Sequence, residues 1–280
     1  MKLVYFCVTF LILIGILIAN IGNINLLLPS SSTASTWYAT QASRQKTILQ
    51  ACWSHGEEVN TVALPERFTY FVEKNLLWCR VFKAGTTTWL VTYFDLIANK
   101  TGGGPILTNF KISDDQTFQS ILSNQPISFA VVRHPFTRLV SAYQDKIVDK
   151  GYPQLKNKTF AEFLDVVIEQ SASCPSTKSC DKMDLHWRPY DQICSFCQVN
   201  YTVISKLETF DADRQMILGM VGIGGERVHL HQGSAHGVRG VSTCQLTRQH
   251  FENIHQTVKE KLRRIYKMDL QMFDYDPFFY

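Results

Sequence analysis

The hydrophobic positions of this chain fall into short apolar runs separated by stripes with helical spacing. Residues 76–82 are a mostly apolar run, and residues 127–132 and 199–204 are two further segments with the composition and length of strands. Apolar residues three or four positions apart recur at Phe136, Leu139, Val140, Tyr143 and Ile147, at Phe160, Phe163, Leu164, Val167 and Ile168, and at Phe251, Ile254, Val258, Leu262 and Ile265. The last set predicts one long C-terminal helix. This alternation predicts an α/β domain over residues 68–280, with a central parallel sheet flanked by helices.

Local signals place the starts of three helices. Pro135 follows the run 127–132 at a position where proline favours the beginning of a helix. Thr159 and Glu162 have the spacing of a capping box. Trp89 opens a further stretch that is able to form a helix after the run 76–82. A strand followed by a short loop and a helix is therefore expected at residues 76–97 and again from residue 127.

The first residues of the chain form an uncharged apolar segment. Residues 3–19 are at the lower edge of the length that spans a bilayer, and Lys2 supplies the nearby positive charge. The pattern predicts a cytoplasmic tail of residues 1–2, a type II signal anchor at 3–19 and a polar stem at 20–67. A cleaved signal peptide ending at Ala19 is the competing interpretation, although Leu17 occupies a position that favours small residues.

Sequons and cysteines are consistent with a lumenal domain. Asn99, Asn157 and Asn200 each begin an Asn-x-Thr acceptor triplet. Seven cysteines follow the apolar segment, so disulfides are expected and at least one thiol is left over: Cys52, Cys79, Cys174, Cys180, Cys194, Cys197 and Cys244. Cys194 and Cys197 have the spacing of half a zinc site, but no second pair follows at zinc-ribbon spacing, which favours a disulfide role.

The formal charge of +4 is too small an excess for a protein whose main partner is nucleic acid, but it permits an anionic ligand. Residues 83–88 place a lysine and then small residues between an expected strand and helix, where backbone N–H groups bind phosphate or sulfate. An ordinary tight turn with a surface lysine has the same composition. The loop of nucleotide triphosphatases is excluded, because its lysine follows the glycines.

A second basic segment follows the run 127–132. Arg133 stands at the carboxyl end of an expected strand, which is the usual ligand side of an open α/β sheet. Arg138, Ser141 and Asp145 fall on the helix face opposite the apolar stripe. A face exposed to solvent would have the same pattern.

These two segments resemble the two motifs that bind 3'-phosphoadenosine 5'-phosphosulfate (PAPS) in the Golgi carbohydrate sulfotransferases, specifically the branch that modifies chondroitin, dermatan and related chains. The resemblance continues through residues 186–189, 193–197, 201–209 and 266–275. It implies a P-loop-like sulfotransferase fold, a Golgi membrane location, PAPS as co-substrate and a glycosaminoglycan or glycoprotein glycan as acceptor.

The resemblance also assigns roles to residues. It implies that the 5'-phosphosulfate is held by Lys83, Ala84, Gly85, Thr86, Thr87 and Thr88. It implies that Arg133 and Ser141 hold the 3'-phosphate, with a further contact from Arg239 in the basic loop 233–240. The chain departs from the family pattern mostly in the first loop and its flanks, residues 82–91, where the lysine, one threonine and Trp89 remain. Residues 90–91 replace a basic pair of the family, and this leaves the acceptor or cofactor contacts at that spot open.

Sulfuryl transfer places growing negative charge on a leaving phosphate. Lys83 and the loop amides are suited to stabilise that charge, so no metal is expected, and the sequence has no evident acidic metal cluster. The acceptor hydroxyl needs a general base, for which His186 is the candidate and His134 a weaker one. A purely structural role for His186 remains the alternative.

The sequence therefore predicts transfer of a sulfuryl group from PAPS to a carbohydrate hydroxyl. One alternative is a membrane-tethered glycan-binding protein that kept the fold and lost catalysis, since the first loop departs from the family pattern. The other is a phosphoryl transferase, against which the position of Lys83 and the missing carboxylates count.

Overall fold

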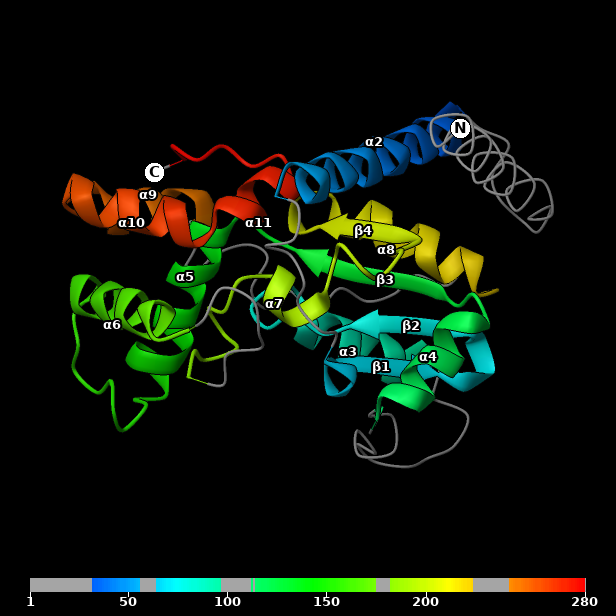
Figure 1. Cartoon of the computed structure of the whole chain (residues 1–280), viewed down its shortest axis with the longest axis horizontal. Coiled ribbons are helices and arrows are strands. Elements are labelled where there is room, and N and C mark those ends of the chain that lie inside the picture. The colour runs from blue at the N-terminus through cyan, green and yellow to red at the C-terminus, as the bar shows by residue number, and fades with distance from the viewer. Residues whose placement is uncertain are drawn as a thin grey trace, which may run out of the picture.

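A four-stranded sheet lies at the centre of the computed structural model, which describes residues 32–55, 64–96, 112, 114–174, 182–223 and 242–279. The strands stand in the order β1 (Phe68–Phe71), β2 (Leu76–Cys79), β3 (Ile127–Val132) and β4 (Val203–Lys206) (Figure 1). β2, β3 and β4 are parallel, whereas β1 is antiparallel to β2. The sheet is thus mixed, and the prediction of a parallel sheet is wrong for β1, because the link through η3 (Val72–Lys74) is too short for a crossover.

β2 and β3 have buried residues at successive positions because helices and loops cover both faces of the sheet. All four residues of β2 are buried, as are the last five of β3. β3 has the predicted bounds, whereas β2 ends three residues before the predicted end at 82. β4 overlaps only the end of the expected run 199–204, since Val199 and Tyr201 are buried outside the sheet.

Helices follow the strands through short connections. α3 (Thr86–Leu96) follows β2, and α4 (Asp115–Ser123) precedes β3. α5 (Pro135–Tyr143) begins at the predicted proline and continues as the π-helix η5 (Gln144–Asp149). α6 (Phe160–Ala172), the short α7 (Asp191–Cys194), η6 (Leu207–Thr209) and α8 (Phe210–Met220) complete this part. The capping box is confirmed, because Glu162 accepts a hydrogen bond from the Thr159 amide at 2.7 Å and the Thr159 hydroxyl accepts one from the Glu162 amide at 3.3 Å.

The predicted single C-terminal helix is wrong. The structure has α9 (Thr243–Glu252), α10 (Gln256–Ile265) and α11 (Lys267–Met272) in its place. The helix is interrupted before His255. The Nδ1 atom of His255 accepts a hydrogen bond from the Thr257 amide at 3.2 Å and so caps α10. In Figure 1, α5, α6, α9 and α10 gather beyond the carboxyl ends of the parallel strands, around a second apolar core.

Residues 32–55 form the helix α2 (Ser32–His55), where the sequence predicted part of a stem. Trp37, Ile48 and Ala51 on one side of α2 are buried in the core of the sheet. Ser, Thr and Ala residues do not prevent a helix when such a stripe is buried. The folded unit therefore includes residues well before position 68.

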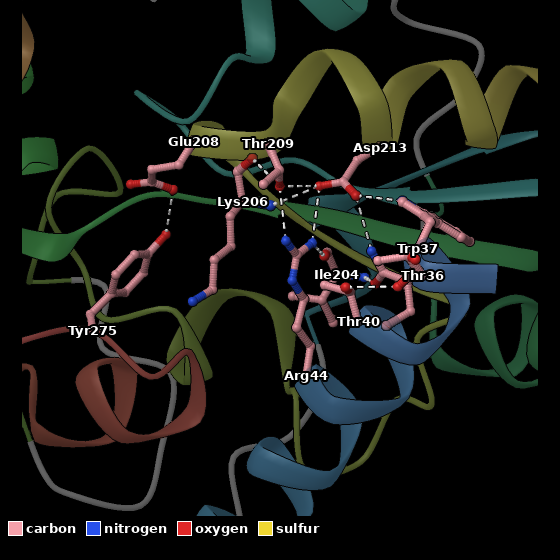
Figure 2. Close-up of polar contacts among 11 residues, drawn as sticks. Thr36, Trp37, Thr40, Arg44, Ile204, Lys206, Glu208, Thr209, Asp213 and Tyr275 are labelled. Carbon is pink, nitrogen blue, oxygen red and sulfur yellow. Dashed lines mark hydrogen bonds and ion pairs between the residues drawn. The ribbon is translucent and has the colours of Figure 1, made fainter. Parts of the chain in front are cut away.

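Polar contacts fix α2 to α8 (Figure 2). The buried carboxylate of Asp213 accepts hydrogen bonds from the Trp37 indole at 2.7 Å, the Gln41 amide at 3.0 Å and the Arg44 guanidinium at 3.0 Å. A disulfide between Cys52 and Cys197 joins the end of α2 to the segment after α7.

The cysteines of the described residues are mostly paired. Cys79 bonds to Cys194, so Cys194 and Cys197 serve two different disulfides and form no zinc half-site. Cys174 is also disulfide-bonded. Cys244 is the free cysteine within the described ranges, which agrees with the expectation of an unpaired thiol.

Several predictions concern residues outside the described part. These are the anchor at 3–19, the sequon at Asn99 and the loop 233–240 with Arg239. Among the residues that are described, no helix combines the length and the hydropathy needed to cross a bilayer. Asn157 and Asn200, which begin the other two sequons, are exposed.

Candidate active site

A short loop connects β2 to α3 and requires glycine at one position. Lys83 and Gly85 both have left-handed backbone conformations, with φ of 66° and 78°. A Cβ atom on Gly85 would stand 3.0 Å from the ring of Phe210 and 3.4 Å from the side chain of Leu207. Glycine is needed here both for the turn and for the close approach to α8.

The amides of this loop are free to bind a ligand. No backbone N–H from residue 83 to residue 88 donates a hydrogen bond to another described residue. These groups include the first N–H groups of α3, where the helix dipole favours an anion. The hydroxyl of Thr86 is engaged, because it donates to the Val81 carbonyl at 2.5 Å.

Arg133 comes from the end of β3 and reaches the same loop. Its guanidinium donates to the Lys83 carbonyl at 3.2 Å. The backbone of Arg133 is held by Tyr190, whose hydroxyl accepts from the Arg133 amide at 3.0 Å and donates to the Arg133 carbonyl at 2.7 Å. Arg133 is only 4% exposed, and no carboxylate of the described residues forms an ion pair with it. Burial lowers the pKa of Arg133 to about 10. A buried cation without a paired carboxylate is costly in a free protein and suits an anionic ligand.

The position of Arg138 opposite the apolar stripe allowed a solvent-exposed face, but Arg138 is buried. It is 1% exposed and donates hydrogen bonds to three main-chain carbonyls. The acceptors are Phe82 at 3.1 Å, Leu185 at 2.8 Å and Arg188 at 2.6 Å. Arg138 thus fixes the position of the β2 loop relative to the segment that carries His186.

The ammonium group of Lys83 lies 3.1 Å from Asp145 of η5. Asp145 also contacts Lys146 at 3.2 Å and Lys150 at 2.8 Å. Burial alone would raise the pKa of Asp145, but the three ammonium groups hold it well below its usual range. Burial lowers the pKa of Lys83, and Asp145 opposes that effect. In the free protein Lys83 is therefore neutralised by a carboxylate that is shared with two other lysines.

His186 stands directly beside the loop. Its ring stacks on Phe82, with 4.6 Å between ring centroids and 18° between planes. Its Nδ1 lies 2.7 Å from the carboxylate of Asp184, and because an ionised carboxylate only accepts hydrogen bonds, this contact places a proton on Nδ1. Nε2 has no hydrogen-bond partner in the described part of the chain. Sequence reasoning missed Asp184, which lies two positions before His186.

The remaining predicted residues are placed less directly. Ser141 is half-buried on α5, and its hydroxyl makes no hydrogen bond to a described residue. His134 uses both ring nitrogens, because Nδ1 accepts from the Phe136 amide at 3.2 Å and Nε2 donates to the Asp276 carbonyl at 2.8 Å. This leaves His134 without a free nitrogen to act as a base.

Comparison with known proteins decides the family. The profile described as "Sulfotransferase family" matches residues 66–276, which is most of the chain. The chain belongs to the sulfotransferase family. The matched region contains the β2 loop, Arg133 and His186, whereas α2 precedes it.

Curated relatives of this family member share about a quarter of its residues. It is 24% identical over 272 residues to Carbohydrate sulfotransferase 8 of Mus musculus, covering 86% of this chain and 65% of the relative. It is 25% identical over 238 residues to Carbohydrate sulfotransferase 11 of Rattus norvegicus, covering 72% and 65%. With Carbohydrate sulfotransferase 11 of Danio rerio it shares 24% over 288 residues, covering 88% and 79%. The chain thus spans 65% of the length of the mouse and rat relatives. No solved structure matches it.

Proposed function

We propose that this chain transfers a sulfuryl group from PAPS to a hydroxyl group of a carbohydrate. Membership of the sulfotransferase family and the printed names of the relatives support this reaction class. The observation that carries the proposal is the hydrogen bond from Arg133 to the Lys83 carbonyl. This contact brings the free amides of the loop after β2 and the guanidinium at the end of β3 into one anion-binding region.

The two parts of this region bind the two ends of PAPS in the proposal. The amides of residues 83–88 and the Lys83 side chain hold the 5'-phosphosulfate, and Arg133 with Ser141 holds the 3'-phosphate. Because the Lys83 carbonyl is occupied by Arg133, its oxygen is not left to repel the incoming anion. Arg239 remains a proposed additional contact.

The chemical step is an in-line displacement at sulfur. The acceptor oxygen forms a bond to sulfur while the bond from sulfur to the 5'-phosphate oxygen breaks, and adenosine 3',5'-bisphosphate (PAP) leaves. Lys83 stabilises the charge that develops on the leaving oxygen. His186 takes the acceptor proton on Nε2, and Asp184 stabilises the resulting imidazolium through Nδ1.

The proposed setting is the Golgi lumen, with the chain anchored as a single-pass type II protein. The two disulfides Cys52–Cys197 and Cys79–Cys194 support an oxidising compartment. The resemblance of the binding segments supports an acceptor of the chondroitin or dermatan type, or a related glycan.

Incubation with labelled PAPS and a panel of chondroitin, dermatan, heparan and N-glycan acceptors tests the proposal. We expect the wild-type protein to label at least one acceptor, and Lys83→Ala to label none. Glycan binding without PAPS binding would instead identify a glycan-binding protein. A preference for ATP over PAPS would identify a phosphoryl transferase.

A further inference from the structure

Each of the three parallel strands leads to a basic residue at the same edge of the sheet. Lys83 follows β2, Arg133 follows β3, and Lys206 is the last residue of β4. Lys206 pairs with Val132, so it lies beside the strand end from which Arg133 continues.

Lys206 is half-buried, and its ammonium group has no ion pair or hydrogen bond to any residue that the structure describes. It lies 4.6 Å from the centroid of the Tyr275 ring. Figure 2 shows the Lys206 side chain extending toward this ring, while the Tyr275 hydroxyl donates to the Glu208 carboxylate at 3.1 Å. A cation that is partly removed from water without an anionic partner is costly, and a ligand anion would remove that cost.

The neighbours of Lys206 are also the neighbours of Arg133. The Tyr275 ring lies 5.1 Å from the ring of His134, the residue next to Arg133. The charge of Glu208 acts on both Arg133 and Lys206, yet it forms an ion pair with neither. Both cations therefore border the same small region at the ends of β3 and β4.

Among the residues that the structure describes, Arg44 is a further cation near this region, and it is already engaged. Its guanidinium bonds to the Ile204 carbonyl at 2.6 Å and to Asp213 at 3.0 Å (Figure 2). Lys206 is thus the cation that keeps its donors available at the end of β4.

We propose that Lys206 binds the same phosphate as Arg133, namely the 3'-phosphate of PAPS. This assignment rests on the proposed function. A phosphate monoester carries close to two negative charges at neutral pH, and one guanidinium balances one of them. Arg133 and Lys206 together balance both, and the Tyr275 ring keeps the Lys206 stem in place.

Calorimetric titration with two nucleotides tests the assignment. PAP carries the 3'-phosphate and adenosine 5'-phosphate lacks it. We expect Lys206→Met to weaken PAP binding by about tenfold or more, the loss typical of a hydrogen bond to a charged group. Binding of adenosine 5'-phosphate should change by less than about twofold, and Lys206→Arg should retain most of the PAP affinity. Lys261→Met, at an exposed position on α10, is the matched control and should bind both nucleotides as the wild type does.

The outcomes separate this assignment from the proposed function. Lys206→Met keeps an apolar stem on Tyr275, and Lys206→Gln provides a second uncharged variant if the first melts at a lower temperature. Unchanged PAP affinity in a folded variant overturns the assignment, including the case in which the KM of the carbohydrate rises instead. Equal losses for both nucleotides also overturn it. Failure of the wild-type protein to bind PAP overturns the proposed function itself.

Discussion

The guanidinium of Arg133 donates a hydrogen bond to the main-chain carbonyl of Lys83 at 3.2 Å, although fifty residues separate the two in sequence. The contact is possible because β2 and β3 are adjacent and parallel, so their carboxyl ends lie at one edge of the sheet. It brings the free amides of a helix N-terminus and a buried unpaired cation into one region. This region is the basis of the proposed nucleotide site.

Asp145 competes with an incoming anion for Lys83. We expect Asp145→Asn to bind PAP about two- to fivefold more tightly than the wild type, because the variant loses a partly exposed ion pair that the ligand must otherwise replace. Calorimetry at two salt concentrations measures the change, which should be larger at low salt. Asp149→Asn alters an exposed carboxylate of the same element and should have no such effect. Weaker binding by Asp145→Asn would show that Asp145 positions Lys83 for the ligand rather than competing for it.

His186 and Asp184 act as a pair in the proposed mechanism. His186→Ala should lower kcat by about 10²- to 10⁴-fold, the usual contribution of a general base, while PAP affinity stays unchanged. Asp184→Asn should also lower kcat, because Nδ1 loses the negative carboxylate that fixes its proton and stabilises the imidazolium. Steady-state kinetics with calorimetry separates the two effects. Wild-type kcat in His186→Ala would leave this histidine with a structural role only.

α2 should be an integral part of the folded domain. Asp213→Ala removes the buried acceptor of Arg44, Trp37 and Gln41, and we expect a loss of about 3–5 kcal/mol in the free energy of unfolding. Asp211→Ala alters an exposed carboxylate on the same helix and should cost less than about 1 kcal/mol. Urea unfolding of both variants measures the difference, and equal stabilities would mean that the contact contributes little.

Stability should depend on pH through Asp191. Burial raises the pKa of Asp191 from 3.8 to about 6. The folded chain keeps a proton that the unfolded chain releases between those values, so this carboxyl lowers the free energy of unfolding as pH rises through that window. We expect the Tm of Asp191→Asn to fall less than that of the wild type between about pH 4 and 6. Each kcal/mol of difference in the free energy of unfolding corresponds to about 2–4 °C in Tm. Parallel Tm curves for the variant and the wild type would be inconsistent with a raised pKa at Asp191.

Local signals in the sequence predicted the elements whose causes are local. β3 has the predicted bounds because a run of apolar residues, interrupted only by Ser128, suffices for a strand that is buried on both faces. The start of α5 at Pro135 and the capping box of α6 depend on residues within one turn. The closeness of Lys83 and Arg133 follows from the same reasoning, since parallel strands end at one edge.

Features that depend on distant partners were missed. α2 was expected to be part of a stem. The residue that holds it in place, Asp213, lies 176 residues after Trp37, so no local pattern indicates the contact. The burial of Arg138 depends on carbonyl groups of two other segments, which helical spacing does not reveal. The sequence analysis included Lys206 only as part of the segment 201–209 that resembles the family. The contact of its ammonium group with the Tyr275 ring depends on tertiary packing, which the local sequence does not reveal.

A crystal structure of the protein in complex with PAP tests the central claim most directly. We expect the 5'-phosphate to accept hydrogen bonds from amides of residues 83–88, and the 3'-phosphate to lie within hydrogen-bond distance of the Arg133 guanidinium. A nucleotide bound elsewhere on the chain, or with its 3'-phosphate remote from Arg133, would contradict the account.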